Sequence, residues 1–164
     1  MDWFVKAFIK ASVTWLALGV TLGLAIAIHP LWVIYRPAHL HMLLLGFVAM
    51  MIYGVAYHVI PRFVGFPLHS TRAAGWHWWM SNAGLLLMVA GFVVRARSGA
   101  VVTVLLSAGG IVAALGAYTF AYVLWRTLDG PKRKLARSRV TGSNRPNLPL
   151  AESSAAAGQT TGGA

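Results

Sequence analysis

The feature that most constrains this chain is an apolar segment between Arg36 and Arg62 that carries three histidines. As a helix, the segment is long enough to cross the ~30 Å hydrocarbon core of a bilayer. Ionisable side chains in such segments are costly and usually face a cavity, a partner or a cofactor. The functional question is therefore what His39, His41 and His58 hold.

The composition of the whole chain is that of a membrane protein. Of its 164 residues, 58% are hydrophobic and 10% are charged, whereas soluble domains carry about 25% charged residues. Four apolar runs predict an all-α fold, a bundle of four transmembrane helices at about residues 8–34, 38–60, 74–94 and 100–125. These helices would form one transmembrane domain over residues 1–128.

The end of the first apolar run allows two interpretations. Ala25, Ile26 and Ala27 have the A-x-A pattern of a signal-peptide cleavage site. However, the run is longer than the apolar region of a typical signal peptide, and Gly19, Gly23 and Ala27 form a small-residue stripe suited to helix packing. These features favour a retained first transmembrane helix.

Basic residues predict the orientation in the membrane. The chain has 14 Lys and Arg against 3 Asp and Glu, and most of the basic residues lie near the N-terminus, in the 61–73 loop and in the tail. The positive-inside rule then places both termini in the cytoplasm. Because this charge lies beside apolar segments, we expect a lipid bilayer rather than nucleic acid as its partner. Residues 129–164 begin basic and become rich in small polar residues, so we expect a disordered cytoplasmic tail.

The available side chains limit the chemistry. The chain has no cysteine, which excludes disulfides, thiolate metal sites and covalent c-type haem attachment. Its acids, Asp2, Asp129 and Glu152, lie outside the predicted helices, which disfavours a proton pump or a carboxylate-coordinated cation transporter. Neutral imidazoles with thioethers and glycines suit haem iron or, less well, copper.

His39 is the first candidate ligand. At 100° per residue it shares a helical stripe with Leu43 and Gly46. A glycine two turns further in leaves room for a flat macrocycle beside the backbone, or it simply lets another helix approach. His29, at the end of the first predicted helix, lies on the same side of the membrane. It is a candidate second ligand to an iron there, or merely part of a helix terminus.

The other histidines also allow two readings. His41 lies nearly opposite His39, on an aliphatic stripe typical of a lipid-facing or packing surface, and it either reaches for water or serves a separate ligand site. His58 and His77 both lie at the inner side of the membrane. They could together form a second haem or metal site, or each could be satisfied by water or carbonyl groups.

Several sequence motifs carry a family resemblance. They are RPAH from Arg36 to His39, WHWWMSN at 76–82, and Gly46, Tyr57 and Pro61. Over residues 5–125 the chain resembles helices one to four of the catalytic subunit I of the haem-copper oxidase superfamily, in the form found in C-family cytochrome c oxidases and nitric oxide reductases. In that family the histidine of the Arg-Pro-x-His motif ligates low-spin haem b. The resemblance therefore implies that His39 is an axial ligand to haem b.

The chain also departs from that family. The family position two residues after the haem ligand is often Asn, whereas this chain has His41. The family's copper ligands and its late-helix His-x-His have no counterpart here, so we do not expect the chain alone to be a complete oxidase. The second axial ligand would come from His29, His41, another copy of the chain or a partner. Another copy of the chain would be present in a homodimer, and a partner would be present in a larger respiratory complex.

We therefore expect an integral protein of the bacterial inner membrane that binds b-type haem. Its role would be electron transfer, or haem or gas binding, in a respiratory context. Two alternatives stay open: a non-catalytic accessory or assembly subunit of a respiratory complex, and a membrane protein that handles copper or haem transiently.

Overall fold

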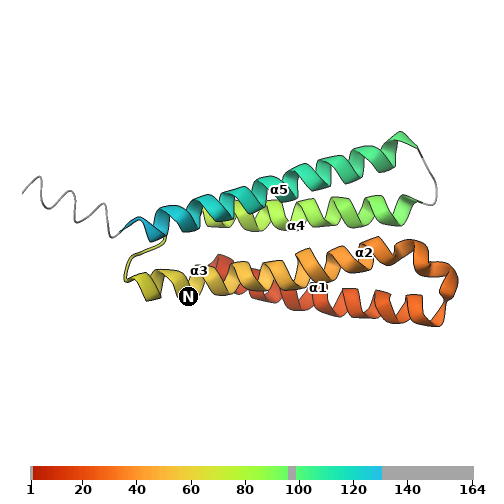
Figure 1. Cartoon of the computed structure of the whole chain (residues 1–164), viewed down its shortest axis with the longest axis horizontal. Coiled ribbons are helices and arrows are strands. Elements are labelled where there is room, and N and C mark those ends of the chain that lie inside the picture. The colour runs from red at the N-terminus through yellow and green to blue at the C-terminus, as the bar shows by residue number, and fades with distance from the viewer. Residues whose placement is uncertain (1, 96–98, 131–164) are drawn as a thin grey trace, which may run out of the picture. The chain divides into compact units, whose positions relative to one another are not determined.

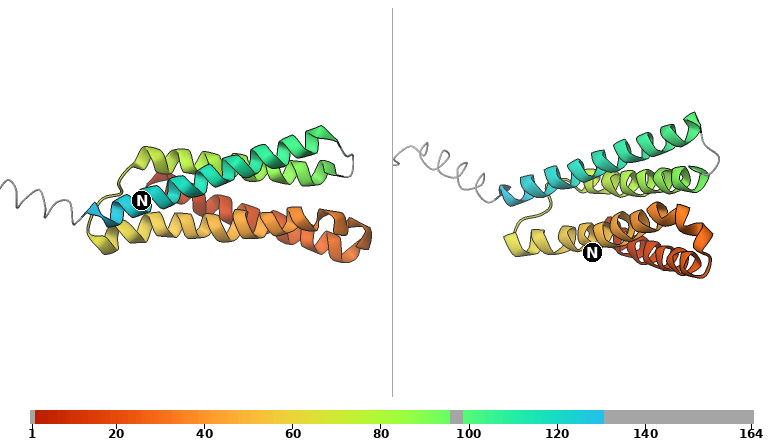
Figure 2. Two further views of the ribbon diagram at one scale, coloured as in Figure 1. Left: turned by 45° about the horizontal axis from the view of Figure 1, so that its top comes forward. Right: turned by 45° about the vertical axis from the view of Figure 1, so that its right-hand side comes forward.

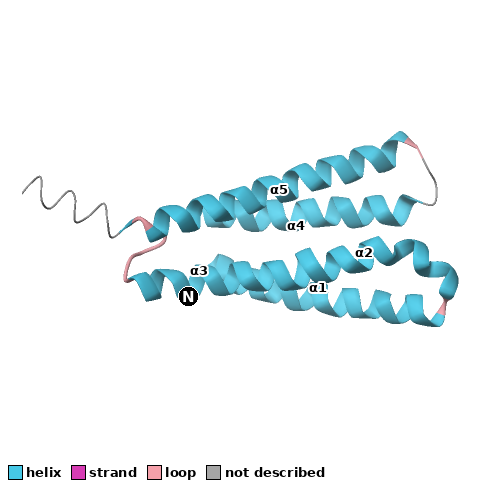
Figure 3. Cartoon of the chain, viewed as in Figure 1, coloured by secondary structure: helices cyan, strands magenta, loops and turns pink. Residues whose placement is uncertain are grey.

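The computed structural model describes residues 2–95 and 99–130, and this part of the chain contains helices and short loops but no strand (Figure 3). Its elements, in chain order (Figure 1), are α1 (Trp3–Ile28), η1 (Pro30–Tyr35), α2 (Arg36–His41), η2 (Met42–Ala49), α3 (Met50–Val64), α4 (Thr71–Val94) and α5 (Ala100–Leu128). The predicted tail lies outside the described residues, except for Asp129 and Gly130.

Four helical spans in this part of the chain are long and apolar enough to cross a membrane. They are α1, the 35-residue span Pro30–Val64, α4 and α5. Large apolar side chains remain exposed on all four, as is expected for surfaces that face lipid. The predicted all-α fold with four transmembrane helices is confirmed, and the chain is a multi-pass membrane protein.

The first helix ends earlier than the sequence predicted. α1 stops at Ile28 rather than near residue 34, because His29 is extended, with φ −118° and ψ 91°. Pro30 follows and begins a 3-10 turn, η1. Proline is disfavoured inside a helix but suits a first helical position, where its missing N–H is not needed. Residues 30–35 therefore belong to the second span.

The second span contains a π-helical stretch directly after the two neighbouring histidines. η2 covers the eight residues Met42–Ala49 and joins α2 to α3 without a break in the helix. A π-helical turn hydrogen-bonds over one residue more than an α-helical turn. The side chains beyond η2 are therefore rotated relative to a regular α-helix.

The spans associate mainly as two neighbouring pairs. α1 packs along η2 and α3, and α4 packs along α5 (Figures 1 and 2). Glycine permits the close approach in both pairs: a Cβ at Gly19 would lie 2.7 Å from Leu43 Cδ2, and one at Gly84 would lie 2.6 Å from the backbone nitrogen of Ala113. The buried core between the spans contains four aromatic residues, Phe4, Phe8, Trp15 and Tyr57.

Candidate functional site

His39 lies in a notch formed by two glycines of α1. Its Nδ1 is 2.8 Å from the carbonyl oxygen of Gly19. A Cβ at Gly23 would lie 2.6 Å from Cε1 of the same ring, so only glycine leaves space for the imidazole there. A carbonyl oxygen only accepts hydrogen bonds, so Nδ1 carries the hydrogen and donates it. Nε2 therefore keeps its lone pair, which is the form in which imidazole binds a metal ion.

His41 has a similar hydrogen bond but faces a different helix. Its Nδ1 lies 2.7 Å from the carbonyl oxygen of Pro37, so Nε2 again keeps the lone pair. The ring centroid is 4.9 Å from that of Phe92 in α4, whereas His39 contacts α1. Residues two apart on a helix do not face each other. Within one copy of the chain, the two imidazoles therefore do not converge on one iron.

The structure does not bring His29 to His39. His29 is exposed after the end of α1, and its ring lies 5.6 Å from the ring of Trp32. Its role as a second ligand remains a prediction.

Gly46 is buried against another helix. A Cβ there would lie 2.6 Å from Cβ of Trp15 and 2.9 Å from Cδ2 of Leu85. Trp15 is itself held in place, because its indole N–H donates to Oδ1 of Asn82 at 3.3 Å. A macrocycle beside Gly46 would therefore require Trp15 to move. Of the two interpretations offered for this glycine, the structure displays helix approach.

His58 and His77 have separate surroundings. His58 is partly exposed and hydrogen-bonds to Arg62, one turn further along α3. His77 is fully buried on α4. The residue of α3 that hydrogen-bonds to His77 is Tyr57, whose hydroxyl lies 3.0 Å from Nδ1 of that histidine. The predicted approach of the two histidines is not seen, because Tyr57 rather than His58 is on the inward face of α3.

His77 is enclosed by aromatic rings from three other spans. Its ring centroid lies 4.9 Å from that of Phe8 on α1, 4.5 Å from that of Tyr53 on α3 and 5.6 Å from that of Phe120 on α5. Its Nε2 has no hydrogen-bond partner in the described part of the chain. We call His77, Tyr57, Tyr53, Phe8 and Phe120 the aromatic cluster. Sequence reasoning placed Tyr53 and Tyr57 on one helical face but did not predict that this face meets His77.

The Tyr57–His77 hydrogen bond should stabilise the fold. We expect Tyr57→Phe to lower the free energy of unfolding by about 1–3 kcal/mol, because it leaves both ring nitrogens of His77 buried without a partner. Titration of the detergent-solubilised protein with sodium dodecyl sulfate, followed by circular dichroism, would measure it. Tyr118→Phe is the control, since Tyr118 is 74% exposed. Equal stability of the two variants would contradict this role.

The described residues offer no ready-made site for a bare metal ion. No group of three or more His, Cys, Asp or Glu side chains lies close enough in this part of the chain to hold one. Haem requires less of the protein, because the macrocycle supplies four ligands and one or two axial side chains complete the set.

One comparison with known proteins found a distant similarity to part of an oxidase subunit. No protein-family profile matches the chain. It is 28% identical over 115 residues to cytochrome c oxidase subunit 1 of Rhodobacter capsulatus. The match covers 55% of this chain but 22% of that subunit. The chain is thus distantly similar to a portion of a much longer membrane protein.

Proposed function

We propose that this chain is an integral b-type haem protein in which His39 is an axial ligand of the iron. The observation that carries the proposal is the hydrogen bond from Nδ1 of His39 to the Gly19 carbonyl, which leaves Nε2 free to coordinate. The similarity to cytochrome c oxidase subunit 1 supports a role in a respiratory context, as electron transfer or as haem or gas binding.

The residues around His39 fit haem in donor type and setting. The Gly19 carbonyl would fix the orientation of the imidazole and increase its basicity as a ligand. Bound haem would supply one-electron or gas-binding chemistry, and the protein would supply orientation and an apolar environment. Gly46 would adjoin the macrocycle if Trp15 moved aside.

His39 and His41 of one copy face different helices, so His41 does not supply the second axial ligand to the same iron. His29 of the same copy, a histidine of a second copy or a histidine of a larger respiratory complex would each complete the iron. A two-fold symmetric pair of bundles would bring the same face of each copy together. His41, on the face toward α4, would serve in a partner's site rather than in that of its own copy.

The proposed location is the bacterial inner membrane with both termini in the cytoplasm. Five of the seven described Lys and Arg residues lie near the end of the bundle where α1 begins and α5 ends, and Arg36 and Arg95 lie at the other end. The positive-inside rule makes this the cytoplasmic end. His39 would then lie toward the outer side.

A visible spectrum of the purified protein tests the haem proposal. We expect protein produced with excess haem to show low-spin b-type bands that sharpen on reduction with dithionite. Extraction of the haem into pyridine would give its type and the haem-to-chain ratio, which distinguishes a shared iron from one iron in each copy. Carbon monoxide would test for an open coordination position. A colourless purified protein would overturn the proposal.

A non-catalytic accessory subunit is the second candidate. The observation that favours it is the packing of Gly46 against Trp15, which fills the space predicted for a macrocycle. In that case the purified chain would be colourless but would co-migrate with a larger membrane complex on a native gel. Metal analysis of the same sample would test transient copper handling.

A further inference from the structure

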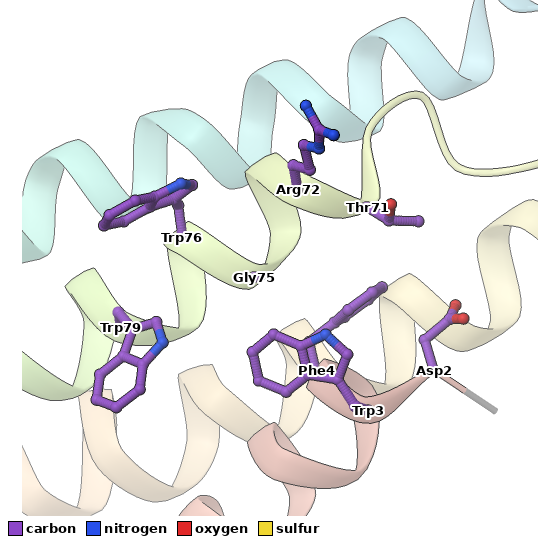
Figure 4. Close-up of a pocket in the computed structure, with 8 residues that line it drawn as sticks. All are labelled: Asp2, Trp3, Phe4, Thr71, Arg72, Gly75, Trp76 and Trp79. Carbon is purple, nitrogen blue, oxygen red and sulfur yellow. The ribbon is translucent and has the colours of Figure 1, made fainter.

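Two hollows of the protein differ in size and surroundings. A groove of about 750 Å³ lies between the beginnings of α1 and α4, and exposed tryptophans line it (Figure 4). A much smaller cavity of about 20 Å³ lies between the second span, α4 and α5. None of the side chains that line the cavity is exposed: Leu45, Ala49, Tyr53, Ser81, Leu85 and Ala113. A site for one water molecule needs at least about 10–15 Å³, so the cavity has room for a single water.

Small side chains from three spans leave this space. Ala49 ends η2, Ser81 lies on α4 and Ala113 lies on α5. Gly116 continues the same side of α5 one turn later. A Cβ at Gly116 would lie 3.3 Å from Oγ of Ser81 and 3.4 Å from Cδ2 of His77. Ser81 and the Cδ2 edge of the His77 ring therefore border the same glycine.

Two polar atoms beside this glycine have no hydrogen-bond partner in the described part of the chain. One is Nε2 of His77, which is bonded to Cδ2 and belongs to a fully buried residue. The other is Oγ of Ser81, one turn further along α4. Side chains four residues apart on a helix are neighbours. Where neighbouring polar atoms make no direct hydrogen bond, a water between them can satisfy both.

The hydrogen bond with Tyr57 indicates which hydrogen His77 carries. The Tyr57 hydroxyl has no other partner among residues 2–95 and 99–130. If the hydroxyl donates to Nδ1, the single unpaired group is Nε2–H. If it accepts from Nδ1–H, the hydroxyl hydrogen and the Nε2 lone pair are both unpaired. Each unpaired buried polar group costs free energy, so the first arrangement is favoured and Nε2–H needs an acceptor.

We propose that the cavity binds one water molecule that joins His77 to Ser81. The water would accept from Nε2–H of His77 and donate to Oγ of Ser81, which would satisfy both atoms. The ring of Tyr53 lines the cavity and packs on His77 with the ring centroids 4.5 Å apart, so it would cover the water from α3. Tyr57, His77, the water and Ser81 would then form one hydrogen-bonded chain between α3 and α4. In this arrangement Nε2 has no lone pair for a metal ion.

Nuclear magnetic resonance of the full chain in detergent, with isotope-labelled histidine nitrogens, tests the proposal. The chemical shift of each ring nitrogen distinguishes N–H from a bare nitrogen, and dipolar contacts with the rings of Tyr53 and Phe120 identify His77. We expect a hydrogen on Nε2 that has a dipolar contact with a long-lived water. This measurement needs no variant, so a substitution that fails to fold does not remove the test. A bare Nε2, or an Nε2–H without contact to water, would overturn the proposal.

Two substitutions of Ser81 separate the hydrogen bond from the space. Ser81→Ala removes the acceptor and keeps the cavity, so the water contact of Nε2–H should fall several-fold. Ser81→Val also fills the cavity and should abolish the contact. The chemical shift of Nδ1, which reports the hydrogen bond with Tyr57, should stay unchanged in both variants. Ser107→Ala is the matched control, because Ser107 is exposed on α5.

An undiminished water contact in either Ser81 variant would overturn the proposal. The same loss in the Ser107 variant would also overturn it, because that serine does not line the cavity. These signals come from His77 and not from His39. The water proposal and the haem proposal can therefore fail independently.

Discussion

Replacing His39 with alanine is expected to remove bound haem from the protein and to leave the helical bundle folded. The substitution removes the Nε2 lone pair that the Gly19 hydrogen bond leaves available. It does not remove a large core side chain, because the ring is only partly buried. We expect haem content to fall at least tenfold, measured from the reduced-minus-oxidised spectrum per mole of protein. Circular dichroism should be unchanged.

Gly23→Ala tests the same ligand by displacing the His39 ring instead of removing it. A Cβ at this position would lie 2.6 Å from Cε1 of His39, so the ring would have to shift away from the Gly19 carbonyl. Loss of such a supporting contact typically lowers metal affinity about 10–100-fold. The affinity of this variant should therefore fall between that of wild type and that of His39→Ala.

His58→Ala is the matched control, since His58 is partly exposed and hydrogen-bonds to Arg62 near the other end of the second span. It should keep full haem content. If His39→Ala bound as much haem as wild type, the assignment of this ligand would be wrong. Loss of haem from His41→Ala instead would transfer the role to His41.

The second large effect is expected where α4 meets α5. A Cβ at Gly109 would lie 2.8 Å from both the Gly84 carbonyl oxygen and the backbone nitrogen of Met88. Backbone atoms cannot move aside as the end of a side chain can, so the two helices would have to separate. We expect Gly109→Ala to lower the free energy of unfolding by about 3 kcal/mol, at the upper end for overpacked cores.

The neighbouring glycine provides the control for that substitution. Nothing lies within 4 Å of a Cβ built at Gly110. Gly110→Ala should therefore leave stability unchanged or raise it slightly, because alanine favours the helix over glycine. Thermal unfolding of both variants in the same detergent would measure the difference. Equal shifts in the two midpoints would contradict the close approach of α4 and α5.

The sequence predicted the helices well and their contacts only in part. Uninterrupted apolar runs are sufficient to identify spans, because a bilayer requires a minimum length of helix. The small-residue stripe at Gly19 and Gly23 predicted helix packing, and the structure places Leu43 and His39 on those glycines. That a histidine would occupy the second notch depends on the register between two spans, which no local pattern specifies.

The contacts around the buried His77 were harder to predict from the sequence. Its neighbours come from three other spans, so their meeting depends on how all four helices pack. The same limit applies to Gly46. Regular helical spacing predicts the face of the helix on which Gly46 lies, but not the residue of another helix that packs against it. Trp15, held by Asn82 from α4, fills that position.

The π-helical stretch at Met42–Ala49 separates the second span into two halves whose relative rotation depends on residue count. If the same eight residues formed a regular α-helix, they would turn further about the helix axis, and α3 would face a different direction relative to α2. His39 would keep its place on α1, while Tyr53 and Tyr57 would swing away from His77. A change that converted this segment to regular α-helix would thus disturb the contacts of α3 and leave those of α2 in place. The length and π-helical geometry of η2 set the rotation of Tyr53 and Tyr57 about the helix axis relative to His39.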